Sequence, residues 1–284
     1  MTITIAIPTY NNEKTIAKAI SSALNQDYSE DFEILVVNNA STDGTQKVIE
    51  SFKNSKIRQV VNRETIDMYS NHNICLKEAK GDYVLFCHSD DELLPNALTI
   101  ISDRIKERKC PKRYVLWGHS LFRDFYHSIL RANLMTNMMF SGEAAVRCFI
   151  HGGLTPSGTC YSRQPLVEMG GFPSSNSKAP AMDWVLMVLA AFNCFEFEMI
   201  DRIYYKRMDA STAVRTMTDK ERIDVNRDAL EEMFKKMTEG QKSFFIAQLI
   251  SRPSYVMLKA VREYIPRKTY IKRYIKMMLT RILG

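Results

Sequence analysis

The first half of the chain alternates short apolar runs with segments of helical periodicity, and this alternation restricts the fold more than any other feature. The apolar runs have the length of buried strands and end at polar or turn-forming residues. The segments between them repeat apolar residues at intervals of three and four, which is typical of amphipathic helices. The pattern predicts strands over residues 3–7, 32–37, 57–61 and 83–87, and helices that end near residues 24, 52, 79 and 108.

This order of elements predicts an α/β fold with a mostly parallel central sheet flanked by helices. The second half is less regular, with a predicted strand over 114–117, a helix over 141–150 and an apolar helix that begins at Asp183. From Thr218 the pattern is helical to the end. We therefore expect one α/β domain over residues 1–215 and a helical C-terminal region over residues 216–284.

Three polar clusters follow predicted strands, at residues 8–12, 38–43 and 88–91. Because ligands of such sheets bind beyond the carboxyl ends of the strands, we expect the three clusters to share one crevice. The last cluster contains two adjacent acids, Asp90 and Asp91, whose mutual repulsion a divalent cation would relieve. Capping of the helix that follows explains the same acids equally well when they are considered alone.

Five segments resemble the family 2 glycosyltransferases, which have the GT-A fold and invert the configuration of the transferred sugar. They are residues 5–11 (IAIPTYN), 21–26 (SSALNQ), 36–45 (VVNNASTDGT), 79–84 with 88–91 (AKGDYV, HSDD), and 169–172 with 183–184 (MGGF, DW). They occur in the order of the family, and the resemblance spans roughly residues 3–212. It implies a catalytic domain with a nucleotide-binding half over 1–110 and an acceptor-binding half over 111–215.

The resemblance also implies roles for single residues. Asp183 matches the catalytic base, and Asp90 matches the final acid of the metal-binding DXD motif, with Mg²⁺ or Mn²⁺ as the cofactor. A base in this position makes chemical sense, because a sugar hydroxyl must lose its proton as the donor bond breaks. The residues expected to contact the nucleotide-sugar are Pro8, Thr9, Tyr10, Asn11, Asn38, Asp43, His88, Ser89 and Asp91.

The sequence departs from the family in three places. His88 stands where the first acid of the DXD motif is usual, and Asn38 with Asn39 replaces a pair that usually contains an acid. Met208 stands where the family often has a histidine. Uridine and thymidine diphosphate sugars remain the expected donors, because an asparagine can still pair with a pyrimidine.

These departures leave open a catalytically silent GT-A protein that binds a nucleotide or a partner enzyme. A nucleotidyltransferase would need a phosphate loop rich in Gly, Lys or Arg after the first strand, and residues 8–12 form no such loop. For His72 and Asn73, which lie near the crevice, we expect a place on a helix surface rather than a donor contact.

The net charge of +7 is concentrated at one end of the 284-residue chain. Residues 252–284 contain nine Lys or Arg and one acid, Glu263, so the other residues sum to −1. Basic residues alternate there with an apolar set at helical spacing, which indicates a basic amphipathic helix able to lie on an anionic membrane. Docking on the catalytic body or on a second subunit is the alternative. The apolar set comprises Tyr270, Ile271, Tyr274, Ile275, Met278, Leu279 and Ile282.

Together with the basic tail, the family resemblance implies an inverting hexosyltransferase of bacterial surface polysaccharide synthesis that acts on a glycan or lipid-linked acceptor. Its near-neutral body argues against a nucleic acid partner, and a homodimer is left open. We read no signal peptide, and the longest apolar run, residues 184–192, is shorter than the roughly 20 residues that span a membrane. The expected location is the cytoplasm, at the inner face of the cell membrane.

Overall fold

The computed structural model describes residues 1–122, 125–126, 136–150, 152–173, 181–207, 217–251 and 254–283. The chain divides into two compact units, each of which is assembled from separate stretches of sequence. The first unit comprises Met1–Ser141, Thr155–Phe172 and Cys194–Ala210, and the second comprises Gly142–Leu154, Pro173–Asn193 and Ser211–Gly284. The predicted domain boundary at residue 215 stays a prediction.

Four parallel strands build the part of the first unit that the sequence predicted best. They are β1 (Ile3–Thr9), β2 (Phe32–Asn38), β3 (Ile57–Val61) and β4 (Tyr83–Phe86). Their order in the sheet is β3-β2-β1-β4, so the chain proceeds outward from β1 in one direction and then returns to pair β4 on its other side. The predicted parallel arrangement is confirmed here.

The sheet continues beyond β4 with strands of both directions. Next to β4 lies the antiparallel strand β9 (Thr159–Ser162), followed by the parallel pair β6 (Tyr114–Phe122) and β10 (Glu196–Arg207). A short strand, β5 (Asp91–Leu93), pairs antiparallel with the end of β10. The small strands β7 (Phe125–Tyr126) and β8 (Met139–Phe140) pair with β6 and β10. Sequence periodicity did not reveal β5, because three residues are too few to show alternation.

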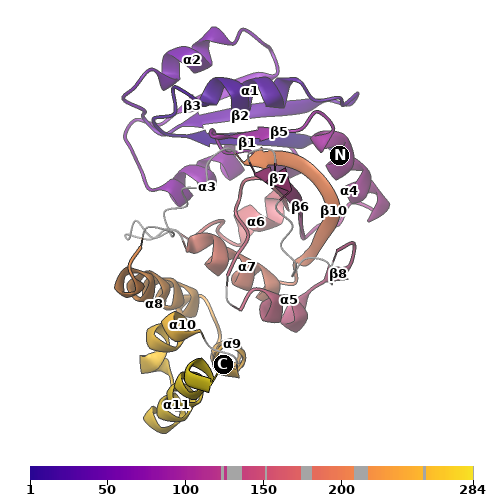
Figure 1. Ribbon diagram of the computed structural model, residues 1–284. Coiled ribbons are helices and arrows are strands. Elements are labelled where there is room, and N and C mark those ends of the chain that lie inside the picture. Colours follow the sequence, from indigo (N-terminus) through magenta and orange to yellow (C-terminus); the bar gives the residue numbers. More distant parts are fainter. Residues whose placement is uncertain are drawn as a thin grey trace. The chain divides into compact units, whose positions relative to one another are not determined.

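Helices cover both faces of the parallel strands, as Figure 1 shows. On one face lie α1 (Ile16–Leu24), α2 (Thr45–Ser51) and α4 (Ala97–Glu107), and on the other lie α3 (Met68–Glu78) and α6 (Arg163–Glu168). Successive strand residues point to opposite faces. Ile3, Ile5 and Ile7 of β1 are therefore buried in the same cluster as the apolar residues of α1 and α4. The strands β1, β2 and β4 are buried on both faces, as strands covered by helices must be, whereas the edge strand β3 carries Arg58 and Gln59.

The second unit is helical among its described residues. Helix α7 (Met182–Phe192) is buried along almost its whole length and packs against α5 (Gly142–Cys148) and α8 (Asp219–Lys235). Thr218 and Glu221 begin α8 with a capping box, as the helical pattern from Thr218 predicted. The remaining helices are α9 (Glu239–Ser251), α10 (Tyr255–Ala260), a 3₁₀ turn (Arg262–Tyr264) and α11 (Arg267–Leu283). Within the described ranges, none of these helices is both long and apolar enough to cross a bilayer.

A buried carboxylate fastens β10 to α4 and β6 in the first unit. Glu198 is fully buried and accepts two hydrogen bonds from the Arg108 guanidinium, at 2.6 and 3.1 Å, and one from the Tyr114 hydroxyl. Burial acts to raise the pKa of Glu198, but the hydrogen bonds from Arg108 and Tyr114 outweigh it and hold the pKa below its usual value. The ionised form is therefore the one that stabilises the fold.

We predict that Glu198→Gln lowers the free energy of unfolding at pH 7 by about 2 kcal/mol, because two charge-assisted hydrogen bonds are lost. A lowered pKa stabilises the folded state above the unfolded-state pKa of about 4.3, and this stabilisation is lost as the pH falls through the folded-state pKa. The difference between variant and wild type should therefore shrink below pH 4, as measured by urea denaturation. Glu50→Gln, at an exposed position of α2, is the matched control.

Candidate functional site

Hydrogen bonds join the loops that follow β1, β2 and β4. The Asn11 amide N–H donates to the Ser41 hydroxyl at 3.0 Å, and the Thr42 N–H donates to the Asn11 side-chain oxygen at 2.8 Å. The Asn12 side chain donates to the Ser89 hydroxyl at 2.9 Å. Asn11 has a φ of +52°, a conformation that Asn tolerates better than most residues. The three predicted clusters thus share one crevice.

A pocket of about 380 Å³ opens between these loops, where the strand order reverses between β1 and β4. This is the position at which doubly wound sheets bind their ligands. Six of the residues predicted to contact the donor or the metal line it: Pro8, Thr9, Tyr10, His88, Ser89 and Asp90. Asn39, Ile66, Asn71 and His72 also line the pocket, and the sequence did not single them out as contacts.

A larger hollow of about 650 Å³ lies at the opposite edge of the sheet. Its lining includes Met1, Asp82 and Tyr83, which stand before or at the start of the parallel strands β1 and β4. Ligands of such sheets bind at the carboxyl ends of the strands instead. The smaller pocket is therefore the candidate site.

Three predicted contact residues are held within the loops. The Asn38 side chain donates to Gln46 at 2.8 Å and accepts from the Ser41 hydroxyl at 2.6 Å. Asp43 accepts from the backbone of Thr45 and of Glu13, and Asn11 bridges to the β2 loop. Their contact with a donor stays a prediction. In the structure they shape the loops that carry the pocket.

The last residue of β1, Thr9, and the residue after it, Tyr10, line the pocket. The Thr9 side chain is 3% exposed, and its hydroxyl has no hydrogen-bond partner among the residues that the structure describes. Leaving a buried hydroxyl unpaired costs about 1–3 kcal/mol, and a polar group that reached this hydroxyl would remove the cost. Tyr10 beside it is 44% exposed and offers an aromatic face at the pocket.

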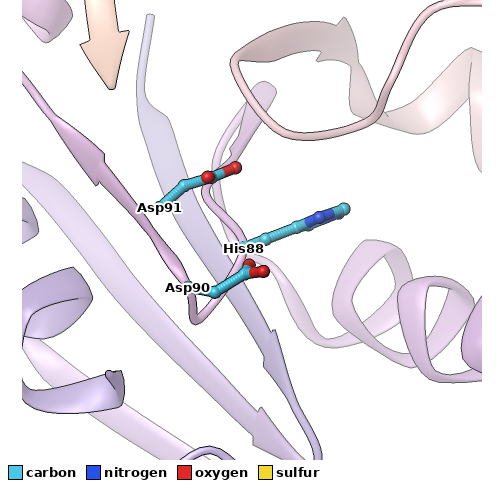
Figure 2. Close-up of side chains that lie close together, drawn as sticks. All are labelled: His88, Asp90 and Asp91. Carbon is cyan, nitrogen blue, oxygen red and sulfur yellow. The ribbon is translucent and has the colours of Figure 1, made fainter. Parts of the chain in front are cut away.

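The acidic cluster follows β4. One ligand atom each of His88, Asp90 and Asp91 lies within 4.8 Å of the others, and Figure 2 shows the three side chains projecting to the same side of the turn. Two carboxylates and one imidazole nitrogen at this spacing fit a divalent cation such as Mg²⁺ or Mn²⁺. Asp91, predicted beside the diphosphate, thus lies within the same potential ligand set as Asp90.

Ser157 supports this cluster from the loop before β9. Its hydroxyl donates to Asp91 Oδ2 at 2.6 Å and accepts from the His88 backbone N–H at 3.1 Å, and the residue is 1% exposed. The next residue, Gly158, has a φ of +75°, and an added Cβ would lie 2.3 Å from the Tyr205 ring. Only glycine fits there. The sequence showed a turn-rich stretch but could not show which hydroxyl faces the acids.

His72 lies inside the molecule, so the expected position on a helix surface is wrong. It is 2% exposed, and its ring lies 5.1 Å from the Phe86 ring and 5.4 Å from the Phe172 ring. Its Nε2 is 3.0 Å from Nε2 of His88. Burial, reinforced by His88, lowers the pKa of His72 to about 3, and burial together with Arg207 lowers the pKa of His88 to about 4.

Asp183 belongs to the second unit and lies in the first turn of α7. Its carboxylate accepts from the Trp184 backbone N–H at 2.7 Å, while the Trp184 indole donates to the Phe149 carbonyl at 2.6 Å. Burial raises the pKa of Asp183 to about 7. A carboxyl with this pKa can accept a proton near neutral pH. Met208, the third departure from the family pattern, lies outside the described residues.

Residues 4–167 match the family model described as "Glycosyl transferase family 2". An uncharacterized protein of Mycobacterium tuberculosis, MT1568, is 29% identical over 68% of this chain and 64% of its own length. The poly(ribitol-phosphate) beta-N-acetylglucosaminyltransferase TarS of Staphylococcus aureus is 36% identical over 36% of this chain and 19% of its own. The chain thus matches less than two thirds of the length of either relative.

The Escherichia coli enzyme WfgD, a UDP-Glc:alpha-D-GlcNAc-diphosphoundecaprenol beta-1,3-glucosyltransferase, is 35% identical over 34% of this chain and 38% of its own length. The crystal structure of TarS residues 1–349 in complex with UDP-GlcNAc superposes with a TM-score of 0.70. That match covers 95% of this chain and 83% of the other at 19% identity, and it confirms the predicted GT-A fold.

We predict that Ser157→Ala weakens Mn²⁺ binding about tenfold, because Asp91 loses the hydroxyl that orients it. The variant should also melt at a lower temperature, because the buried His88 N–H loses its acceptor, so the affinities are compared at a temperature where both proteins are folded. Titration calorimetry with MnCl₂ measures the affinity, and Ser51→Ala on the exposed surface of α2 is the control. Unchanged Mn²⁺ affinity in Ser157→Ala would show that Asp91 does not bind the cation.

Proposed function

This chain belongs to the family 2 glycosyltransferases, and from that premise we propose that it transfers a sugar from a nucleotide-sugar to a glycan or lipid-linked acceptor. The expected donor is a UDP- or dTDP-sugar, and the expected setting is the synthesis of a bacterial surface polysaccharide. The names of two relatives support this setting, because TarS is described as acting on poly(ribitol-phosphate) and WfgD as acting on a sugar linked to diphosphoundecaprenol.

The observation that carries the proposal is the pocket at the β1–β4 reversal, which has the acidic cluster at one side. Its 380 Å³ is within the size range of small-molecule sites. The exposed Tyr10 ring supplies an aromatic surface for a nucleoside. A nucleoside in the pocket would place its diphosphate toward His88 and Asp90, which line the same cavity.

Asp90, Asp91 and His88 would hold a divalent cation, with Ser157 orienting Asp91. A bound cation would neutralise the charge of the departing diphosphate. His88 adds no negative charge, so the two aspartates carry the charge that attracts the cation. The Ser89 hydroxyl accepts a hydrogen bond from the Asn12 side chain in the loop after β1. This bond fixes the position of the acidic cluster relative to the nucleoside side of the pocket.

Asp183 is the proposed catalytic base. It would take the proton of an acceptor hydroxyl while that oxygen bonds to the anomeric carbon and the bond from this carbon to the diphosphate oxygen breaks. The nucleoside diphosphate leaves with the bonding electron pair, and the single displacement inverts the anomeric configuration. Its pKa of about 7 supports this role, because a base is most effective when its pKa is near the working pH.

One experiment tests the activity and the base together. The purified protein is incubated with UDP-, dTDP- and GDP-sugars, MnCl₂ and candidate glycolipid acceptors, and released nucleotide is measured. Asp183→Asn should bind the donor as wild type does and lose at least about a hundredfold in transfer. Wild-type transfer at low substrate should rise with pH to a plateau above about 7, because only the ionised carboxylate accepts a proton.

The stability of the same variant provides an independent readout. A raised pKa destabilises the folded protein as pH rises from the unfolded value of about 3.9 toward 7, so Asp183→Asn should melt at a higher temperature than wild type at pH 8. Normal transfer by the variant would reject Asp183 as the base. If no donor binds at millimolar concentration, the protein is a catalytically silent member of the family.

The membrane contact that we propose lies on α11. Tyr270 and Tyr274 stack on each other at 5.9 Å, and Lys259 of α10 lies over the Tyr274 ring at 4.9 Å, so both tyrosines face α10. Ile271 and Ile275 stay 44% and 52% exposed. The residues predicted to form one apolar face therefore fall into two groups: the tyrosines face α10, and the isoleucines are exposed. The side chains of Met278, Leu279 and Ile282 lie outside the described part of the helix.

Exposed lysines at positions 268, 272 and 276 accompany the two isoleucines at the same helical spacing. Apolar residues flanked by lysines fit the interface of an anionic bilayer, where each lysine contributes about 1 kcal/mol. We propose that this surface of α11 holds the protein at the membrane that carries its acceptor.

We predict that Ile275→Asp reduces cosedimentation with vesicles containing phosphatidylglycerol at least about fivefold, because it removes apolar contact and adds a like charge. Wild-type binding should weaken in 0.5 M NaCl, since salt screens the lysines. Val61→Asp, at an equally exposed apolar position of β3, is the control and should bind vesicles as wild type does. Equal binding by both variants would remove α11 from the membrane contact.

A further inference from the structure

Two imidazole rings meet beside the acidic cluster, and the transfer chemistry described above uses only one of them. His72 reaches from α3 and His88 follows β4, and their Nε2 atoms are 3.0 Å apart. The other ring nitrogen of His72, Nδ1, lies 2.7 Å from the Met68 carbonyl oxygen, one helical turn earlier. The three groups form a chain of hydrogen bonds that ends at His88.

The order of protons along this chain follows from its first member. A carbonyl oxygen only accepts, so Nδ1 of His72 must carry a proton. A buried imidazole is neutral and carries only one proton, so Nε2 of His72 is an acceptor. Nε2 of His88 must then donate to it. The proton on Nε2 leaves Nδ1 of His88 with its lone pair.

The surroundings hold both rings in this arrangement. Tyr69, Phe86 and Phe172 pack around His72, with ring centroids 6.1, 5.1 and 5.4 Å from its own. These rings enclose His72, and its Nε2 is directed at His88. The backbone of His88 is tied to Ser157, the same residue that holds Asp91.

We propose that His72 is a positioning residue that keeps His88 in the tautomer with an unprotonated Nδ1, through which His88 binds a divalent cation together with Asp90 and Asp91. The inference rests on the proposed function only in taking a divalent cation as the ligand. Histidines that bind metals commonly donate their other N–H to an acceptor that fixes the tautomer. Here the acceptor is a second histidine, which is carried by α3.

The nitrogen donor changes which cation the site prefers. Mg²⁺ takes oxygen ligands almost exclusively, whereas a nitrogen ligand is accepted more readily by transition metals, of which Mn²⁺ is the weakest binder. A site with an imidazole in place of a carboxylate carries one negative charge less and one softer donor more. The structure therefore assigns this chain a preference for Mn²⁺ over Mg²⁺, set by His88 and maintained by His72.

The tautomers are measured first, on metal-free protein labelled with ¹⁵N-histidine. Long-range ¹H–¹⁵N correlation should show His72 protonated at Nδ1 and His88 protonated at Nε2. His72→Phe keeps an aromatic ring but removes the acceptor, so His88 should become a mixture of tautomers. His72→Gln places an amide oxygen near the position of Nε2 and should restore the wild-type tautomer. An unchanged His88 tautomer in His72→Phe overturns the positioning role.

Metal coordination is measured next, on the full chain with MnCl₂. Electron spin echo modulation should show coupling of Mn²⁺ to a histidine nitrogen in wild type and in His72→Gln, and no coupling in His88→Asp. Titration calorimetry should show Mn²⁺ affinity reduced about tenfold in His72→Phe and within about threefold of wild type in His72→Gln. The ratio of Mn²⁺ to Mg²⁺ affinity should fall at least about tenfold in His88→Asp, which restores an all-oxygen set.

None of these measurements requires sugar transfer, so the inference and the proposed function can fail separately. Nitrogen coupling in a protein that transfers no sugar supports the inference and rejects the activity. Transfer without nitrogen coupling in Mn²⁺-loaded wild type rejects the inference and leaves the activity standing. Failure of MnCl₂ to bind at millimolar concentration rejects the cation site itself.

Discussion

The hydrogen bonds between the loops after β1, β2 and β4 are the interaction on which the site depends. Each strand contributes one polar segment, and the parallel register brings the segments to the same edge. The bonds from Asn11 to the Ser41 loop and from Asn12 to Ser89 then fix their spacing. Asn can fill this role at Asn11 because its side chain accepts while its backbone adopts a positive φ. Sheet topology therefore sets where the pocket lies, and these amides set its shape.

The sequence predicted the sheet edge well because the signals for it are local. Strands β1 to β4 are short apolar runs with polar ends, and the alternation with helices determines their parallel direction. Asp90 and Asp91 come shortly after the end of a predicted strand, so their place at the sheet edge could be predicted. The motifs shared with the family led to the same crevice, and the fold comparison agrees with both.

The contacts that could not be predicted from the sequence join residues far apart in the chain. Ser157 reaches Asp91 across 66 positions, and His72 reaches His88 from a helix whose buried side was not evident. The helix α3 carries polar residues at buried positions, including Asn71 and His72, so its pattern resembled a solvated surface. Asn71 and His72 can be buried because each has a hydrogen-bond partner outside the helix. Periodicity reports burial of apolar groups and says nothing about paired polar ones.

The unpaired hydroxyl of Thr9 has a consequence for how the pocket and the fold are coupled. The folded chain carries the penalty of a buried polar group without a partner among the described residues. A ligand whose binding moved the end of β1 enough to reach this hydroxyl would remove the penalty, so part of its affinity would come from a cost that the folded chain already carries. The pocket would then favour such a ligand over one that fills the same volume without a polar group near Thr9. Selectivity at this end of the pocket would therefore depend on a hydrogen bond that the folded chain leaves unmade.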